Sequence, residues 1–431
     1  MYAQRDSLGY IERRRVERLQ EDYDKNCSVS MNEFVELSVL TNEAKHVWRE
    51  AKNTNNFASF VPYIEKNVEK KKIIAGHMKP SADPYDVYLS EYLNGADRKF
   101  CDAYFEKIKG AIVPLIRRVG EKRQVGNHFL KGSFAIEKQR ELSKYLMEVM
   151  TLPPDRCVLG EVEHPCMIGL DINDIRITTH YYQDNLPMSL FSVIHEAGHG
   201  LYELGIQPAY RNTILKTPIS SAMHESQSRF FENYIGRSEA FCGVFLPKLQ
   251  EIFSDHFADV TAHELFLAVN KAEPSLIRIQ ADELTYSMHI VIRYEIEKML
   301  FDGAIAVAQI PETWRHLYKE YLGVGVLDDE HGALQDVHWS GGMFGQFPAY
   351  SLGSAYAAQT LDAMKKDFDV YASVAEGNLT PIVDWLGEKI HRDGGALDVA
   401  DLLLQSCGAP FDPSYYIKYL TEKFSAIYQL D

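Results

Sequence analysis

The segment His195–His199, which reads His-Glu-Ala-Gly-His, limits most strongly how this chain can fold. Its two histidines are four residues apart, so on a helix they share one face and can bind the same metal ion. Uncharged residues flank the segment, from Phe191 to Ile194 and from Gly200 to Tyr202. We therefore predict a buried helix in which His195 and His199 form half of a catalytic zinc site and Glu196 faces the metal's water.

Two histidines do not complete a catalytic zinc site, which normally has three protein ligands and one open position for water. A metzincin would have a glycine at position 202 and a histidine at position 205, but Tyr202 and Gly205 stand there. The metzincin class is therefore excluded, and a glutamate is the natural candidate for the third ligand.

Glu225 is the residue that we assign as the third ligand. It lies far enough downstream for the first helix to end, for a proline-containing loop to turn and for a second helix to return. Two alternatives are Glu203, which follows the second histidine by one helical turn, and His224. Glu203 would line up with both histidines, whereas tetrahedral geometry needs a different direction. His224 fits a neighbour of the site better than a ligand.

Several further motifs follow the order of a known peptidase family. They are His164-Pro165-Cys166, Asp174-Ile175-Arg176-Ile177-Thr178, His195 to His199, His224-Glu225-Ser226-Gln227, Ile277-Arg278-Ile279-Gln280-Ala281-Asp282 and Gly332-Ala333-Leu334-Gln335-Asp336-Val337-His338-Trp339. The chain thereby resembles the Taq-type thermostable metallocarboxypeptidases over about residues 80 to 431. Cys166 departs from the family pattern, which has an aromatic residue at this position.

The resemblance implies a carboxypeptidase that removes one residue from the free C-terminus of a peptide, with broad preference. It also implies a homodimer. Many members carry further helices ahead of the point where this chain begins. We therefore expect residues 1–80 to form an N-terminal helical segment, with a shortened lid as one role for it, and residues 81–431 to form the catalytic domain.

Two arginines are candidates for binding the substrate's terminal carboxylate. We predict one long helix from Pro274 to Leu300, largely apolar, with a polar face. That face carries Arg278, Asp282, Tyr286, His289 and Arg293. Ion pairs along the helix would explain it without any substrate. Because the guanidinium fork matches a carboxylate, we predict that Arg278, and next Arg293, bind substrate.

A glycine-rich stretch from Gly323 to Tyr356 is predicted to be a long irregular loop that brings polar groups to the site. Zinc peptidases usually keep a histidine or tyrosine to stabilise the developing oxyanion. We choose His331 and Tyr350 as catalytic candidates, and His338 as a third candidate that contacts substrate. The alternative for each is a buried, hydrogen-bonded side chain.

The stretch from Asp171 to Tyr182 alternates in polarity and is rich in β-branched and aromatic residues, which predicts a strand directly before the metal helix. As an exposed edge strand it could pair with the substrate backbone. For the side chains of Asp174 and Arg176, a structural role in a small sheet is the alternative that we favour.

Helical periodicity dominates the rest of the chain, so we predict a mainly α protein folded around a deep active-site groove, with a small β-sheet beside the metal helix. The net charge of −16 opposes nucleic-acid binding. Residues 1–21 lack a hydrophobic signal core, and no apolar run reaches membrane-span length. Six cysteines without a paired motif fit free thiols. We therefore expect a cytoplasmic protein without membrane partners.

The predicted mechanism is metal-assisted peptide hydrolysis. Zn²⁺ held by His195, His199 and Glu225 would activate water, and Glu196 would take the water's proton and return it to the leaving amine. The same ligands accept Co²⁺ or Mn²⁺. A helical oligoendopeptidase or dipeptidase with the same motif is the alternative enzyme. An inactive peptide-binding protein is disfavoured because the three proposed ligands and the proposed base are all present.

Overall fold

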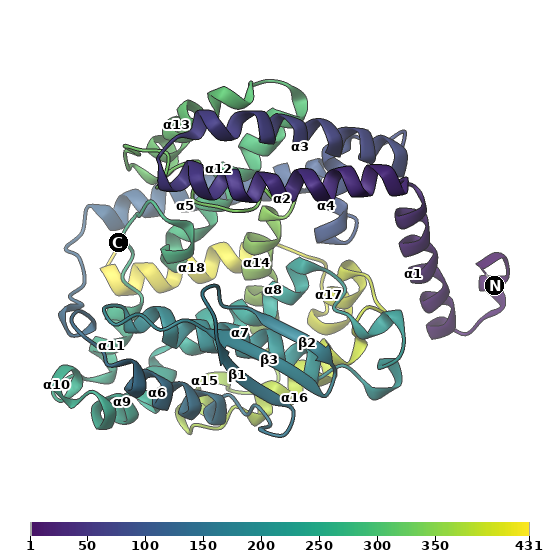
Figure 1. The fold of residues 1–431 in the computed structure, drawn as a ribbon. Coiled ribbons are helices and arrows are strands. Elements are labelled where there is room, and N and C mark those ends of the chain that lie inside the picture. The colour runs from purple at the N-terminus through teal and green to yellow at the C-terminus, as the bar shows by residue number, and fades with distance from the viewer. Residues whose placement is uncertain (1, 431) are drawn as a thin grey trace. The chain divides into compact units, whose positions relative to one another are not determined.

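The computed structural model describes residues 2–430, which form helices and one small three-stranded sheet (Figure 1). The predicted mainly α fold is therefore confirmed. The chain divides into two compact units, each built from two segments that are distant in sequence. The first unit contains residues up to Arg118 and Ala272–Ser351, and the second contains Val119–Lys271 and residues from Leu352 onward. The predicted boundary near residue 80 stays a prediction.

The first unit is built from helices, joined by turns and by one long loop after Leu322. Its elements are η1 (Tyr2–Ser7), α1 (Tyr10–Cys27), α2 (Met31–Asn53), α3 (Phe57–Met78), α4 (Pro84–Leu93), most of α5 (Arg98–Gly120), η6 (Arg278–Gln280), α12 (Glu283–Asp302), η7 (Val307–Gln309), α13 (Ile310–Leu322) and the start of α14 (Phe347–Met364). Within the described residues, no helix is long and apolar enough to cross a membrane.

The helix predicted from Pro274 to Leu300 is shorter than expected, because α12 begins at Glu283. The side chain of Asp282 accepts hydrogen bonds from Thr285 N at 3.0 Å and Thr285 Oγ1 at 2.8 Å, which makes Asp282 the N-cap. Arg278 lies ahead of this cap in the separate 3₁₀ turn η6. The prediction that Arg278 and Arg293 share one helix was therefore wrong.

The second unit contains the sheet and the helix with both histidines. Its elements are η2 (His128–Leu130), α6 (Ile136–Val149), β1 (Cys157–Glu161), β2 (Met167–Asp171), β3 (Asp174–Thr179), α7 (Leu186–Leu204), η3 (Pro208–Tyr210), η4 (Ile214–Lys216), α8 (Ser221–Arg229), the π-helix η5 (Phe230–Gly236), α9 (Glu239–Ile252), α10 (Ser254–Phe257), α11 (Ala262–Val269), the rest of α14, α15 (Val370–Ala375), α16 (Thr380–Lys389), η8 (His391–Asp393), α17 (Val399–Cys407) and α18 (Ser414–Tyr428).

The sheet has the order β1-β3-β2, with β3 parallel to β1 and antiparallel to β2. One face of β3 packs on α7, where Ile175 and Ile177 are fully buried. Gly200 of α7 makes this packing close, because a Cβ there would lie 3.2 Å from Ile175 Cγ2. The small sheet beside the helix with both histidines is therefore as predicted.

The stretch predicted as one strand from Asp171 to Tyr182 contains a turn. The chain turns at Ile172-Asn173, so Asp171 ends β2 and the strand β3 begins at Asp174. Since β3 is the middle strand, its backbone is paired on both sides. The expectation that this strand is a free edge for substrate was therefore wrong. The outer strands of the sheet are β1 and β2.

Candidate metal centre

Helix α7 carries the His-Glu-Ala-Gly-His segment. Pro187 lies in its first turn, a position that needs no backbone N–H donor, and most of its remaining residues are buried. His195 and His199 are partly exposed, whereas Glu196 between them is buried. The two imidazole rings lie 4.9 Å apart between centroids. The helix thus presents both histidines on one side, as the sequence predicts.

Ser220 caps the start of helix α8, because its Oγ accepts a hydrogen bond from Met223 N at 3.0 Å. This helix crosses α7 at Gly198, where a Cβ would lie only 2.6 Å from Gln227 O and 2.7 Å from Ser228 Cα. A second glycine, Gly353 of α14, makes room for the stem of Glu225, since a Cβ there would lie 2.8 Å from Glu225 Cγ. Gly198 therefore lets α8 approach α7 closely, and Gly353 lets α14 approach Glu225.

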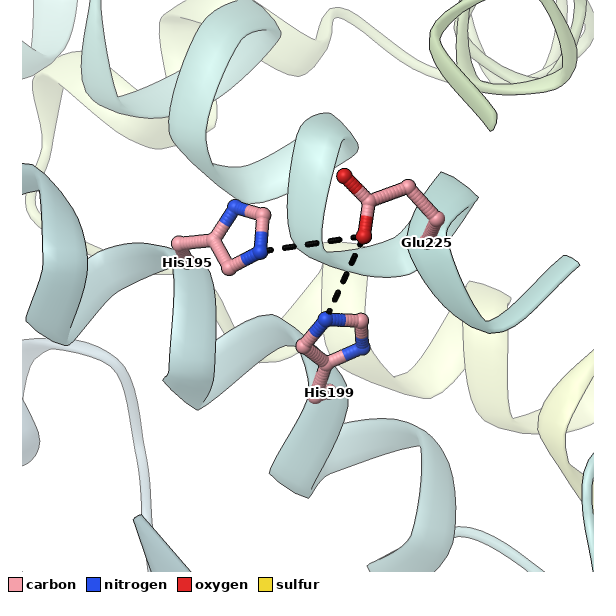
Figure 2. A group of neighbouring side chains, drawn as sticks. All are labelled: His195, His199 and Glu225. Atoms are coloured by element: carbon pink, nitrogen blue, oxygen red, sulfur yellow. Dashed lines mark ion pairs between the residues drawn. The ribbon is translucent and has the colours of Figure 1, made fainter. Parts of the chain in front are cut away.

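His195, His199 and Glu225 form one group of possible metal ligands (Figure 2). Glu225 Oε2 lies 3.8 Å from His195 Nε2 and 3.5 Å from His199 Nε2. Ligand atoms about 2.0–2.1 Å from a tetrahedral zinc ion would be about 3.3 Å apart. Two imidazole nitrogens and one carboxylate oxygen at this spacing fit three of the four positions around zinc after a small contraction.

Glu203 and His224, the alternative third ligands, lie outside this group. The His224 ring stacks on that of His199 with centroids 4.2 Å apart, and its Nε2 lies 3.6 Å from Glu203 Oε1. Glu203 points toward β2, because its carboxylate occupies the space where a Cβ of Gly169 would be. Burial lowers the pKa of His224 well below its ordinary value and raises the pKa of Glu203.

Charged neighbours determine the ionisation of the group. Burial alone would raise the pKa of Glu225, but Arg229 and the two imidazoles outweigh it and hold this pKa well below its usual range. Burial would lower the pKa of His195, yet the charge of Glu225 and a hydrogen bond from His195 to Glu232 raise it. Glu225 is therefore an anion over the whole physiological range.

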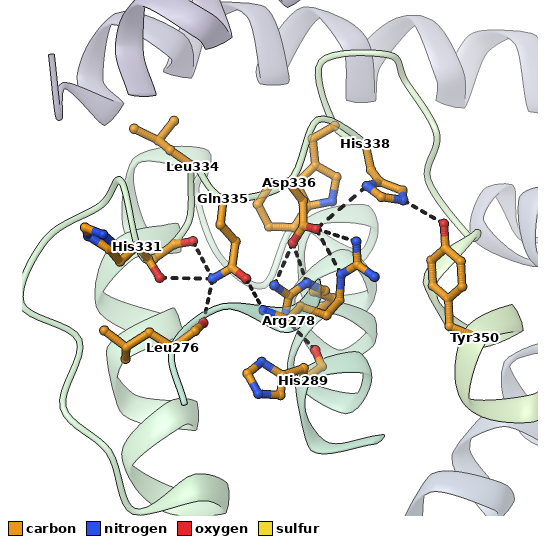
Figure 3. A network of polar contacts seen from close by, with 12 residues as sticks. Leu276, Arg278, His289, His331, Leu334, Gln335, Asp336, His338 and Tyr350 are labelled. Atoms are coloured by element: carbon orange, nitrogen blue, oxygen red, sulfur yellow. Dashed lines mark hydrogen bonds and ion pairs between the residues drawn. The ribbon is translucent and has the colours of Figure 1, made fainter. Parts of the chain in front are cut away.

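The candidate substrate residues lie in the first unit and form a buried network (Figure 3). Asp336 is its centre: Oδ1 accepts from Arg278 Nε at 2.9 Å and Nη2 at 2.8 Å, and Oδ2 accepts from Arg293 Nε at 2.6 Å. Arg278 also donates to the hydroxyl of Tyr286 at 3.3 Å. Two guanidiniums share one carboxylate, so the cluster keeps a net positive charge.

His338 and Tyr350 adjoin this cluster, with His338 Nε2 3.0 Å from the Tyr350 hydroxyl. Burial lowers the pKa of His338 to about 3, more than the nearby Asp336 can raise it, so the ring is neutral. The guanidinium of Arg278 lies 5.1 Å from the centre of the Tyr350 ring. Four of the predicted residues, Arg278, Arg293, His338 and Tyr350, are thus brought together.

His331 is separate from that group. Its ring is exposed, and Nδ1 lies 2.8 Å from Asp328 Oδ1, which also accepts from His331 N at 2.8 Å. Only its backbone oxygen joins the network, by accepting from Gln335 Nε2 at 3.0 Å. A catalytic role for His331 stays a prediction, and its observed contacts are those of a loop turn.

Comparison with known proteins identifies the family. A family model described as carboxypeptidase Taq (M32) metallopeptidase matches residues 2–424. The chain belongs to this family. It is a metallocarboxypeptidase, and the predicted resemblance is confirmed.

Relatives of this Taq-family chain are similar over nearly its whole length. "Carboxypeptidase 1" of Bacillus subtilis is 37% identical, covering 100% of this chain and 86% of the relative. "Thermostable carboxypeptidase 1" of Thermus thermophilus is 32% identical over 96% of this chain and 83% of the relative. The crystal structure of an M32 carboxypeptidase from Deinococcus radiodurans matches with a TM-score of 0.96 at 32% identity, covering 98% of this chain and 86% of that one.

Three residues beside the metal group of this Taq-family chain were not predicted from the sequence: Arg229, Glu232 and Gly353. Glu225, Arg229 and Glu232 follow one another at four- and three-residue steps, a spacing that places side chains on one helix face and could have revealed them. Gly353 gives no local signal, because it meets Glu225 only through the fold.

Proposed function

We propose that the protein is a zinc carboxypeptidase whose metal ligands are His195, His199 and Glu225. The observation that carries this proposal is the group of two imidazole nitrogens and one carboxylate oxygen, all within 4.8 Å of one another. This donor set is typical of catalytic zinc, which has three protein ligands and one open position. Co²⁺ and Mn²⁺ are expected substitutes.

Glu196 is the proposed general base. When bound, zinc supplies a Lewis acid that acidifies water and polarises the scissile carbonyl. Glu196 follows His195 directly on α7 and is buried, so it is shielded from solvent next to one of the proposed ligands. It takes the proton of the attacking water and returns it to the leaving amine.

The residues around Asp336 are the proposed substrate contacts. Arg278 binds the terminal carboxylate of the peptide, and Arg293 supports it through their shared partner Asp336; this assignment is supported by the net positive charge of the cluster. The Tyr350 hydroxyl donates a hydrogen bond to the developing oxyanion. Neutral His338 orients that hydroxyl from Nε2 and contacts substrate. His331 is the less supported catalytic candidate.

A matched pair of peptides tests the exopeptidase assignment. A short peptide with a free C-terminus is expected to lose its last residue, and the same peptide with an amidated C-terminus to react at least about 100-fold more slowly, because it lacks the charge that Arg278 binds. Product masses distinguish the outcomes. Efficient cleavage of the amide at an internal bond would favour the oligoendopeptidase alternative.

Glu196→Gln tests the base. The variant keeps the shape of the side chain and all three proposed ligands, so zinc content should stay at the wild-type value while kcat falls by about 10²–10⁴-fold. Hydrolysis at the wild-type rate would contradict the mechanism.

Light scattering of the purified protein would test the proposed homodimer, and cell fractionation would test the proposed cytoplasmic location.

A further inference from the structure

Four side chains form a closed ring of contacts beside the proposed metal position. His195 Nδ1 donates to Glu232 Oε2 at 2.9 Å, and Arg229 Nη1 donates to the same oxygen at 3.1 Å. Arg229 Nε donates to Glu225 Oε1 at 2.7 Å. Glu225 Oε2 then faces His195 Nε2 at 3.8 Å. Each member of this ring contacts the next.

The contact with Glu232 determines which nitrogen of His195 can bind metal. Because Nδ1 carries the proton that is donated to the carboxylate, the lone pair is on Nε2, the atom nearest Glu225. His199 differs, since its buried Nδ1 has no hydrogen-bond partner among the described residues. Of the two histidines, His195 is therefore the one whose ring is fixed by a carboxylate.

The contact with Arg229 determines which oxygen of Glu225 can bind metal. A glutamate can offer a metal one oxygen or both. Here Oε1 is occupied by Arg229 Nε, and only Oε2 faces the imidazoles. A single-oxygen ligand leaves a coordination position for water, which a catalytic site requires.

Burial gives these contacts more weight than surface ion pairs have. The side chains of Arg229, Glu232 and Glu225 are 13%, 12% and 8% exposed. Glu232 is also held by Arg237, whose Nη2 lies 3.3 Å from Oε1. Charge-assisted hydrogen bonds in such surroundings fix side-chain rotamers, whereas exposed pairs contribute little.

We propose that Arg229 and Glu232 are positioning residues of the metal centre: Glu232 holds His195 for binding through Nε2, and Arg229 restricts Glu225 to one ligand oxygen. This inference rests on the proposed function. It adds that the affinity and coordination of the metal depend on two residues that do not themselves bind it.

Zinc affinity, measured by competition with a chromophoric chelator, tests the proposal. Glu232→Gln and Arg229→Met should each bind zinc about 10–100-fold more weakly than wild type, the usual effect of removing such an outer partner. Arg140→Met is the matched control, because Arg140 also pairs with two carboxylates, Glu137 and Glu161, but its side chain is 39% exposed. Its zinc affinity should equal that of wild type.

The visible absorption spectrum of the Co²⁺-substituted protein is a second test of Arg229. A purely structural role of Arg229 would leave this spectrum unchanged. Arg229→Met frees Glu225 Oε1 for the metal, so the visible bands should weaken as coordination rises from four to five. Arg229→Lys, which keeps a donor for that oxygen, should restore the wild-type spectrum. Superimposable spectra for wild type and Arg229→Met would overturn the role of Arg229.

Two outcomes separate failure of this inference from failure of the proposed function. If the wild-type protein binds no zinc, the proposed function is wrong. If wild type binds one zinc ion and the zinc affinity of Glu232→Gln is within twofold of the wild-type value, only the proposed role of Glu232 is wrong. Should Glu232→Gln not fold, Glu232→Asp carries the same test, since it keeps the charge but withdraws the oxygen from Nδ1; undiminished affinity would overturn the proposal.

Discussion

At the scale of single residues, the metal centre depends on small side chains as much as on its ligands. Gly198 lets the backbone of α8 approach α7, and Gly353 accepts the stem of Glu225. The histidines could be predicted because their spacing is local. The two glycine contacts could not, because each joins residues from elements that are separated in sequence.

Gly198→Ala should damage both folding and metal binding. Its Cβ would lie 2.6 Å from Gln227 O, a backbone atom that cannot move alone, so α8 must shift and carry Glu225 away. We expect a loss of about 1–3 kcal/mol in the free energy of unfolding, together with weaker zinc binding. Urea unfolding and chelator competition measure the two effects.

Gly387→Ala is the control in the same unit. Nothing lies within 4 Å of a Cβ at this helical position. Alanine there should be neutral or stabilise by about 0.5–1 kcal/mol, because it reduces the freedom of the unfolded chain. If both alanine variants changed the free energy of unfolding and the zinc affinity by the same amounts, the close approach of α8 would not explain why position 198 is a glycine.

Asp336→Asn should strongly destabilise the first unit, because it leaves two buried guanidiniums without their carboxylate. Breaking a buried pair in this way costs about 3–5 kcal/mol. The exposed pair Asp329–Arg315 is the control, and Asp329→Asn should cost less than about 1 kcal/mol. Thermal unfolding of both variants at neutral pH gives the comparison.

The difference between wild type and Asp336→Asn should also depend on pH. Burial would raise the pKa of Asp336, but the two arginines hold it well below its usual value. The Asp336 carboxylate therefore stabilises the folded state fully above about pH 4, the pKa of an aspartate in the unfolded chain. This stabilisation is lost as the pH falls below that value. A difference that stayed constant down to pH 2 would contradict this account.

At the scale of elements, sequence periodicity located helices better than it located their ends. The helix predicted to carry His195 and His199 is present as α7, whereas the helix predicted from Pro274 began too early. Apolar residues continue through η6, so periodicity alone could not reveal the cap at Asp282. For the strand, the cluster Asp171-Ile172-Asn173-Asp174 was a turn signal that alternation obscured.

Asp282→Ala tests the start of α12. Alanine removes both hydrogen bonds to Thr285 and the one from Glu273 N at 3.1 Å. We expect the free energy of unfolding to fall by about 1–2 kcal/mol, whereas Asp282→Asn, which can still cap, should be close to wild type. Urea unfolding distinguishes the two variants, and equal losses would show that capping is not the cause.

At the scale of the whole molecule, the sequence predicted the chemistry better than the organisation. Motif spacing and order indicated the ligand group and the family. Each compact unit, however, combines two distant segments, and α5 and α14 pass from one unit to the other. No local pattern encodes such a division. The pairing of Arg278 and Arg293 with Asp336 is equally non-local, so the sequence could name these arginines but not their shared partner.

The most direct test of the central claim is the zinc content of three purified proteins: wild type, Glu225→Gln and Glu203→Gln. Wild type and Glu203→Gln should each retain one zinc ion per chain after dialysis against a weak chelator. Glu225→Gln should lose it, because an amide oxygen is a much poorer zinc ligand than a carboxylate. Zinc retained in Glu225→Gln but lost from Glu203→Gln would contradict the account.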